Sequence, residues 1–218
     1  SELVKGLSEK TITALKIMSE HSVSIGIRGE RTAEVLDRLS IHNWQIIGCP
    51  SFYEPYRKNQ HISCRETFGE TICYNTKPGG EREHKLIEMA ALTSAPLILQ
   101  AMGDLPLTLT EGKRIEKAVL EDKYPGLKMT ANELETYIQN HGHIFFARNE
   151  WSEFLVNNSV ALSVGGRFHG NMMAFSNGIP ALWLVCDERI KEMVDAMKLP
   201  FIFYEKLDDI HEPEEFFG

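Results

Sequence analysis

The sequence predicts an α/β fold, a doubly wound and mainly parallel sheet of the Rossmann-like type. Short apolar runs alternate with segments of helical periodicity along nearly the whole chain. The apolar runs are continuous instead of alternating with polar residues. This pattern is typical of parallel strands that helices cover on both faces.

Strands are expected where β-branched and aromatic residues form short runs that end at turn residues. They cover residues 23–27, 44–48, 71–75, 96–100, 143–147, 159–164, 181–185 and 201–204. In a doubly wound sheet, ligands bind beyond the carboxyl ends of the strands, at a switch point of the topology. Residues that directly follow these runs are therefore the candidates for function.

Helices are expected where apolar residues recur at helical spacing. They cover residues 8–18, 32–39, 82–92, 113–120, 131–140, 150–156, 170–176 and 188–197. Thr130 and Glu133 form a capping box before 131–140, and Asp187 caps 188–197. Asn177-Gly178 ends the helix at 170–176. We expect one domain over 1–218, with a linker helix at 1–20 and a solvated tail at 208–218.

Composition narrows the class of protein. With 218 residues, 43% of them hydrophobic, the chain is long enough to bury a core. The net charge of −8 argues against a nucleic-acid binder, which needs a basic surface. No apolar stretch is long enough to span a bilayer, and no signal peptide is visible. The four cysteines lack C-x-x-C spacing, as expected of free thiols in the cytoplasm.

The first candidate site follows the strand at 23–27. Arg28 and Gly29 stand between this strand and a helix. A helix N-terminus offers free N–H groups and a partial positive charge, so this position favours a phosphate or a carboxylate. Alternatively, Arg28 pairs with Glu30 and only closes the turn.

The second candidate site follows the strand at 159–164. Gly165-Gly166 ends the strand, and Arg167 and His169 precede the next helix. Arg167 can hold an oxyanion with paired donors, and His169 titrates near neutral pH, which suits proton transfer. The alternative is that His169 caps the helix. Asn75 and Gln100, which end the strands at 71–75 and 96–100, are weaker candidates.

Two motif groups support a family resemblance. Gly166-Arg167-Phe168-His169-Gly170-Asn171 precedes Asn177-Gly178-Ile179-Pro180. Upstream, Ile27-Arg28-Gly29-Glu30-Arg31-Thr32 precedes Ile47-Gly48-Cys49-Pro50-Ser51. In this order the motifs resemble the C-terminal, phosphoenolpyruvate-binding half of polysaccharide pyruvyl transferases, which have a glycosyltransferase-B-like architecture. The N-terminal domain of that family is expected to be absent from this chain.

The resemblance implies roles for individual residues. Arg28, Arg167 and His169 match catalytic, donor-binding positions. Many members have an aspartate where this chain has Gly29, so that role is missing or passes to Glu30. The substrate-binding set that we expect is Phe168, Gly166, Gly170, Asn171, Glu30 and Asn75.

The resemblance also implies a reaction, in which pyruvate from phosphoenolpyruvate is attached to a sugar of an exopolysaccharide or cell-wall glycan as a ketal. The expected partners are phosphoenolpyruvate and a glycan or lipid-linked acceptor, with no nucleic acid, no metal and no cofactor. We expect a cytoplasmic protein. Membrane association through the acceptor and homo-oligomerisation stay open. Two alternatives also stay open: a glycosyltransferase with a nucleotide-sugar donor, and a non-catalytic glycan-binding domain.

Overall fold

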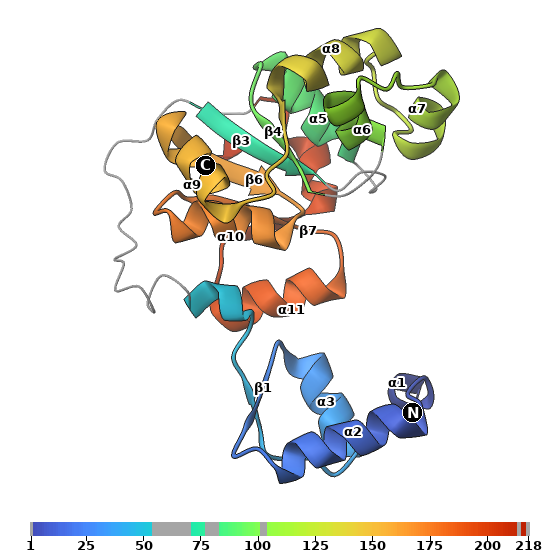
Figure 1. Ribbon diagram of the computed structural model, residues 1–218, viewed down its shortest axis with the longest axis vertical. Helices are drawn as coiled ribbons and strands as arrows, with labels where there is room; N and C mark the ends of the chain where they lie inside the picture. Colours follow the sequence, from blue (N-terminus) through green and yellow to red (C-terminus); the bar gives the residue numbers. More distant parts are fainter. Residues whose placement is uncertain (1, 54–70, 77–82, 101–103, 213–214, 217–218) are drawn as a thin grey trace. The chain divides into compact units, whose positions relative to one another are not determined.

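The chain forms two compact units (Figure 1). The computed structural model describes residues 2–53, 71–76, 83–100, 104–212 and 215–216. Unit 1 consists of residues 1–54 and 187–199, and unit 2 of residues 55–186 and 200–218. The expectation of a single domain over 1–218 stays a prediction, because compactness does not show whether a unit folds alone.

Unit 1 contains a parallel pair of short strands with helices around it. Ile25 of the first strand pairs with Trp44 of the second. The elements are α1 (Glu2–Lys5), α2 (Glu9–Glu20), β1 (Ile25–Ile27), α3 (Glu30–Arg38), β2 (Trp44–Ile46), η1 (Pro50–Tyr53) and α11 (Glu188–Met197). The helix expected at 188–197 and its Asp187 cap are confirmed, since the Asp187 side chain accepts a hydrogen bond from the Ile190 N–H.

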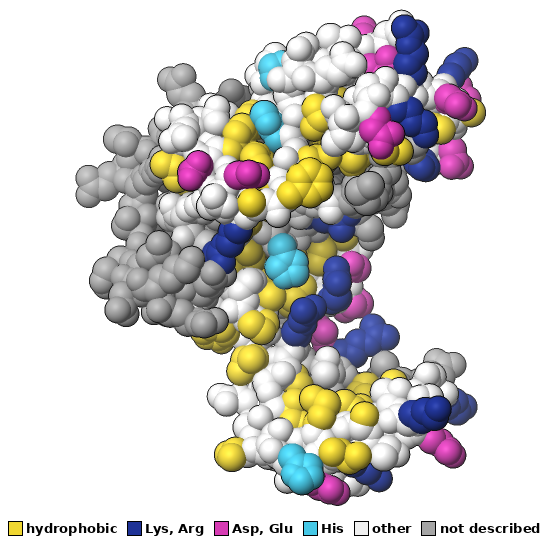
Figure 2. All heavy atoms as spheres, in the orientation of Figure 1, with side chains coloured by type: hydrophobic (Ala, Val, Ile, Leu, Met, Phe, Trp, Pro, Cys, Tyr) yellow, Lys and Arg dark blue, Asp and Glu magenta, His cyan; other side chains and the backbone are white. Residues whose placement is uncertain are grey.

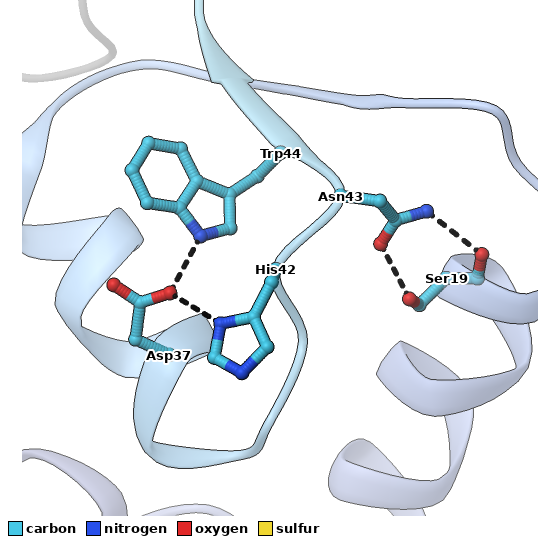
Figure 3. Close-up of polar contacts among 5 residues, drawn as sticks. All are labelled: Ser19, Asp37, His42, Asn43 and Trp44. Carbon is cyan, nitrogen blue, oxygen red and sulfur yellow. Dashed lines mark hydrogen bonds and ion pairs between the residues drawn. The ribbon is translucent and has the colours of Figure 1, made fainter.

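Polar side chains fix the turn that enters β2 (Figure 3). The Asn43 amide donates to the carbonyls of Ser19 (2.9 Å) and Ser22 (2.8 Å), and it accepts a hydrogen bond from the Ser19 hydroxyl. The end of α2 is therefore bound to this turn. The Asp37 carboxylate accepts hydrogen bonds from Trp44 (2.9 Å) and His42 (3.0 Å), and these bonds lower its pKa, Trp44 more than His42.

Unit 2 is built on a six-stranded parallel sheet with the strand order β5-β4-β3-β6-β7-β8. The strands are β3 (Thr71–Thr76), β4 (Leu97–Leu99), β5 (Gly142–His143), β6 (Val160–Gly165), β7 (Ala181–Val185) and β8 (Phe201–Phe203). The other elements are α5 (Glu83–Leu92), α6 (Asp104–Glu111), α7 (Lys117–Lys123), α8 (Ala131–His141), α9 (Arg148–Asn157), α10 (Phe168–Ser176) and η2 (Tyr204–Asp209). The predicted doubly wound α/β fold is confirmed.

Helices cover both faces of this sheet: Figure 1 shows α5, α6 and α8 on one side and α9 and α10 on the other. From β3 the chain proceeds outward to β4 and β5, and from β6 it proceeds in the opposite direction to β7 and β8. The winding direction therefore reverses between β3 and β6, which are neighbours. Since all strands are parallel, their carboxyl ends share one edge, and the switch point lies on that edge.

Several predicted elements were wrong in extent, those at 143–147 and 113–120 most of all, and one helix was missed. The strand expected at 143–147 covers only Gly142–His143, because β4 offers partners to these two residues alone. Beyond them, Phe145 stacks on Trp151 of α9 (5.6 Å). The helix expected at 113–120 is shifted to α7. The missed helix is α6, whose alternating Leu and Thr residues suggest a strand, but whose Leu105 is fully buried.

The capping signal predicted for the helix at 131–140 is confirmed. Thr130 and Glu133 form both bonds of the capping box before α8.

The tail expected to be solvated is only partly so. Ile210 and Phe216 pack against the core, and Phe216 lies 6.3 Å from the ring of Tyr74. These apolar side chains bury more surface against the sheet than a free tail would.

The surface near α7 carries both acidic and basic side chains. In Figure 2, acidic and basic side chains are interspersed over this helix, and Lys117 and Glu121 form an exposed ion pair (3.4 Å). This part of the visible face therefore has no area of a single charge. Within the described ranges, no helix combines the length and the apolar character needed to cross a membrane.

Candidate functional site

The candidate site of unit 2 lies at the switch point, where β3 ends in Asn75-Thr76 and β6 ends in Gly165. The two strands are paired directly, with Asn75 opposite Gly165. Arg167 is the N-cap of α10, so the helix begins at this edge of the sheet. The second candidate site predicted from the sequence is thus placed where doubly wound folds bind ligands.

Asn75 connects β3 to the start of α10. Its side chain is 1% exposed. The amide donates to Asn171 Oδ1 (2.6 Å) and Ser163 Oγ (3.3 Å), and its oxygen accepts the backbone N–H of Arg167 (3.0 Å). Both amide hydrogens are therefore used within the protein. In this structure, Asn75 orients the residue that begins α10.

Asn171, one turn further along α10, is also a buried amide whose hydrogen bonds are made within the protein. It is fully buried, and its amide donates to the carbonyls of Gly165 (3.0 Å) and Leu182 (2.9 Å). Its oxygen accepts from Asn75 and from Ser163 (2.9 Å). The structure thus gives Asn171 a role in holding α10 against β6 and β7, whereas contact with a substrate stays a prediction.

Two glycines of the motif lie in close contact with protein side chains. An ideal Cβ on Gly166 would stand 2.5 Å from the Tyr204 hydroxyl, and one on Gly170 would overlap the amide nitrogen of Gln100. Tyr204 and Gln100 occupy the space that a side chain would need at these positions, so packing requires both glycines. The substrate contact that the resemblance implies for Gly166 and Gly170 stays a prediction.

Arg167 carries a buried donor that the described protein does not use. Its Nε atom is buried, and within the described residues it has no hydrogen-bond partner. A buried guanidinium N–H without a partner is costly, so an acceptor from outside the chain would complete it. An oxyanion fits, since Arg167 stands at the positive end of the nine-residue helix α10.

His169 and Phe168 form the first turn of α10 and have different environments. His169 is exposed, and its ring lies edge-on to Phe168 with the centroids 5.6 Å apart. The Phe168 side chain is buried against Trp183 (5.9 Å), and its carbonyl accepts the indole N–H of Trp183 (3.3 Å). Phe168 therefore anchors the helix start, while the imidazole of His169 is accessible to a substrate.

A buried acid beside this site was missed by the sequence analysis. Glu83, the first residue of α5, is 2% exposed. Its carboxylate accepts hydrogen bonds from the Thr76 hydroxyl and from the Tyr204 hydroxyl (2.5 Å). Nothing local in the sequence pairs Glu83 with Tyr204, because 121 positions separate them. A carboxylate at a helix start normally indicates only a favourable dipole interaction.

Burial raises the pKa of the Tyr204 phenol well above its usual range. The charge of Glu83 and the hydrogen bond to it raise this pKa further, whereas the positive charge of Arg167 acts in the opposite direction. Tyr204 therefore stays protonated and donates to Glu83 throughout the working pH range. The effect of Arg167 also shows that its guanidinium lies within electrostatic reach of the phenol.

The first candidate site belongs to unit 1. Arg28 is exposed at the end of β1, and Gly29 is the N-cap of α3. One backbone N–H of this helix start is used within the protein, because Glu192 of α11 accepts the N–H of Arg31. Binding of a phosphate or carboxylate at this helix start stays a prediction. Glu30 is exposed and lines a cavity of about 610 Å³ beside the helix start. The convergence of Arg28 with Arg167 and His169 stays a prediction, since these residues belong to different units.

Across the part of the chain that the structure describes, no three His, Cys, Asp or Glu side chains are grouped so that they could hold a metal ion.

A comparison with known protein families gives a match. A sequence model of a family described as polysaccharide pyruvyl transferase matches residues 6–188 of the 218-residue chain. The match includes both candidate sites. No curated protein matches the chain.

Proposed function

Because the chain belongs to the polysaccharide pyruvyl transferase family, we propose that it transfers a pyruvyl group from phosphoenolpyruvate to two hydroxyls of a sugar as a ketal. The family is one of transferases, and its model covers the motif that begins α10. The donor and the product are the proposed part. The observation that carries them is the buried, unpartnered Nε of Arg167 among the described residues, at the positive end of α10.

The reaction balances without a further reagent. The enol carbon of phosphoenolpyruvate gains a proton and becomes a methyl group, and one sugar hydroxyl attacks the neighbouring carbon and gives up a proton. The bond from this carbon to the phosphate oxygen then breaks. The second hydroxyl attacks the same carbon, and its proton leaves with the phosphate.

Arg167 and His169 are suited to different parts of this reaction. The guanidinium of Arg167 and the N–H groups at the start of α10 would hold an anionic group of the donor. Such positioned donors stabilise the charge that develops on a leaving phosphate. His169 is exposed beside them and would act as the general acid or base. The donor carries a phosphate and a carboxylate, and Arg28 is proposed as its second cationic contact.

The acceptor is proposed to be a glycan or a lipid-linked saccharide of exopolysaccharide or cell-wall synthesis, and the site of action the cytoplasm. These assignments rest on the family. The reaction as written uses phosphoenolpyruvate as a substrate and needs no cofactor.

The proposal is tested by phosphate release from phosphoenolpyruvate in the presence of a glycan acceptor. Arg167→Ala and His169→Gln should each lower the rate by about a hundredfold or more, because each removes a group that acts on the transition state. Arg148→Ala and His141→Gln are matched controls from the same unit and should retain activity.

Equal rates in all four variants would refute the assigned roles. Stabilisation by a nucleoside diphosphate and not by phosphoenolpyruvate would instead indicate a nucleotide-sugar glycosyltransferase. Binding of an oligosaccharide, but of neither donor, would indicate a glycan-binding domain.

A further inference from the structure

The hydrogen bond between Tyr204 and Glu83 crosses the carboxyl edge of the sheet. Glu83 follows β3 and Tyr204 follows β8, and β6 and β7 lie between these two strands. The two side chains therefore meet over the ends of β6 and β7. The Tyr204 hydroxyl also lies against Gly166, since an ideal Cβ on this glycine would stand 2.5 Å from it.

Gly166 is the residue directly before Arg167, so this contact limits where Arg167 can lie. On one side, the backbone N–H of Arg167 is bound by Asn75 (3.0 Å). On the other side, the Tyr204 hydroxyl packs against Gly166 and donates to Glu83, which in turn accepts a hydrogen bond from the Thr76 hydroxyl. All four side chains are buried, with exposures from 0% to 3%. The turn before α10 is therefore enclosed by fixed polar groups.

We propose that Glu83 and Tyr204 form a positioning pair, which fixes the Gly165–Arg167 turn so that the Arg167 guanidinium faces the anionic donor. The pair does not touch the donor. This inference rests on the proposed function for the identity of that donor. The geometric part, that the pair orders the turn, does not depend on it.

The two carboxylate oxygens of Glu83 have separate partners, and the phenol of Tyr204 stays a hydrogen-bond donor. Tyr204 remains a neutral donor at working pH, since its pKa lies well above its usual range. Glu83 offers one oxygen to Tyr204 and the other to Thr76. A glutamine at position 83 could satisfy both partners, because its oxygen accepts from Tyr204 and its amide donates to the Thr76 hydroxyl.

Four variants test the pair by the Kd of phosphoenolpyruvate and by the KM and kcat of the transfer. Tyr204→Phe and Glu83→Ala should weaken donor binding and raise KM by roughly tenfold or more, because a displaced guanidinium loses its alignment. Glu83→Gln should bind the donor as the unchanged protein does. Tyr137→Phe is the matched control. It removes from α8 a buried phenol hydroxyl, which donates to the Ala95 carbonyl (2.7 Å).

A structural role alone predicts a different result: Tyr204→Phe and Tyr137→Phe would change melting temperature and KM to the same extent. That result would overturn the proposal, as would an unchanged Kd in Tyr204→Phe.

Amide hydrogen exchange separates this inference from the proposed function. Tyr204→Phe should speed exchange in the peptide that covers residues 164–172, and Tyr137→Phe should not. If the unchanged protein binds no phosphoenolpyruvate, the proposed function fails, and the exchange result still decides whether the pair orders the turn. Unchanged exchange in Tyr204→Phe would refute the positioning role in either case.

Discussion

His143 illustrates how burial sets the charge of a side chain in this protein. It lies partly buried at the end of β5, with its ring 4.3 Å from that of Phe154. Burial lowers the pKa of its imidazole, and the nearby His141 lowers it further. The folded protein therefore favours the neutral form of His143.

The lowered pKa predicts a loss of stability in acid. Below about pH 6.5 the unfolded chain binds a proton at this histidine more readily than the folded chain, so the free energy of unfolding falls as the pH falls. His143→Phe should reduce this loss between about pH 7 and about pH 5, measured by urea unfolding. The exposed His211→Phe is the control. An equal loss in all three proteins would contradict the prediction.

The sequence identified those candidate site residues that stand next to other informative residues in the chain. Arg167 and His169 follow a strand and two glycines, and both lie at the carboxyl edge. Glu83 and Tyr204 were missed, because their partnership depends on the strand order β3-β6-β7-β8, which no local pattern contains. For the same reason, the sequence did not reveal that Gly166 and Gly170 pack against Tyr204 and Gln100.

At the scale of elements, the start of α10 depends on buried amides. Asn171 supplies donors to two carbonyls and an acceptor to two side chains, all buried or partly buried. These bonds join β3, β6, β7 and α10 at one point. The position of Arg167 is thus a consequence of the polar network beneath it.

Asn171→Leu should therefore lower the free energy of unfolding by about 3 kcal/mol, because it leaves several buried polar groups without partners. Asn158→Leu is the control. Asn158 makes an exposed bond to the Phe154 carbonyl (2.8 Å), and its loss should cost less than about 1 kcal/mol. Chemical unfolding of the two variants checks this difference. Similar losses would show that the network contributes little.

Elements whose apolar pattern agreed with their packing were predicted correctly. β7, α8 and α11 combine a clear pattern with a clear terminus signal, and their bounds are confirmed within a residue. α6 was missed because the burial of Leu105 is a tertiary effect that its own sequence does not show. The strand predicted over residues 144–147 is absent for a related reason, since β4 is too short to pair with them.

At the scale of the whole molecule, the sequence indicates a parallel α/β sheet but not its strand order. The order places the switch point between β3 and β6 and so selects which strand ends form the site. Arg167, which we propose to hold the donor anion, lies in unit 2 together with Asn75, which binds its backbone N–H.

Calorimetric titration with phosphoenolpyruvate tests this claim most directly, because it reads donor binding without an acceptor. We predict saturable binding by the unchanged chain and by Arg148→Ala, and binding weaker by about a hundredfold or more in Arg167→Ala. Thermal unfolding would verify that the variants keep their fold. An unchanged Kd in Arg167→Ala, or no binding by the unchanged chain, would contradict the account.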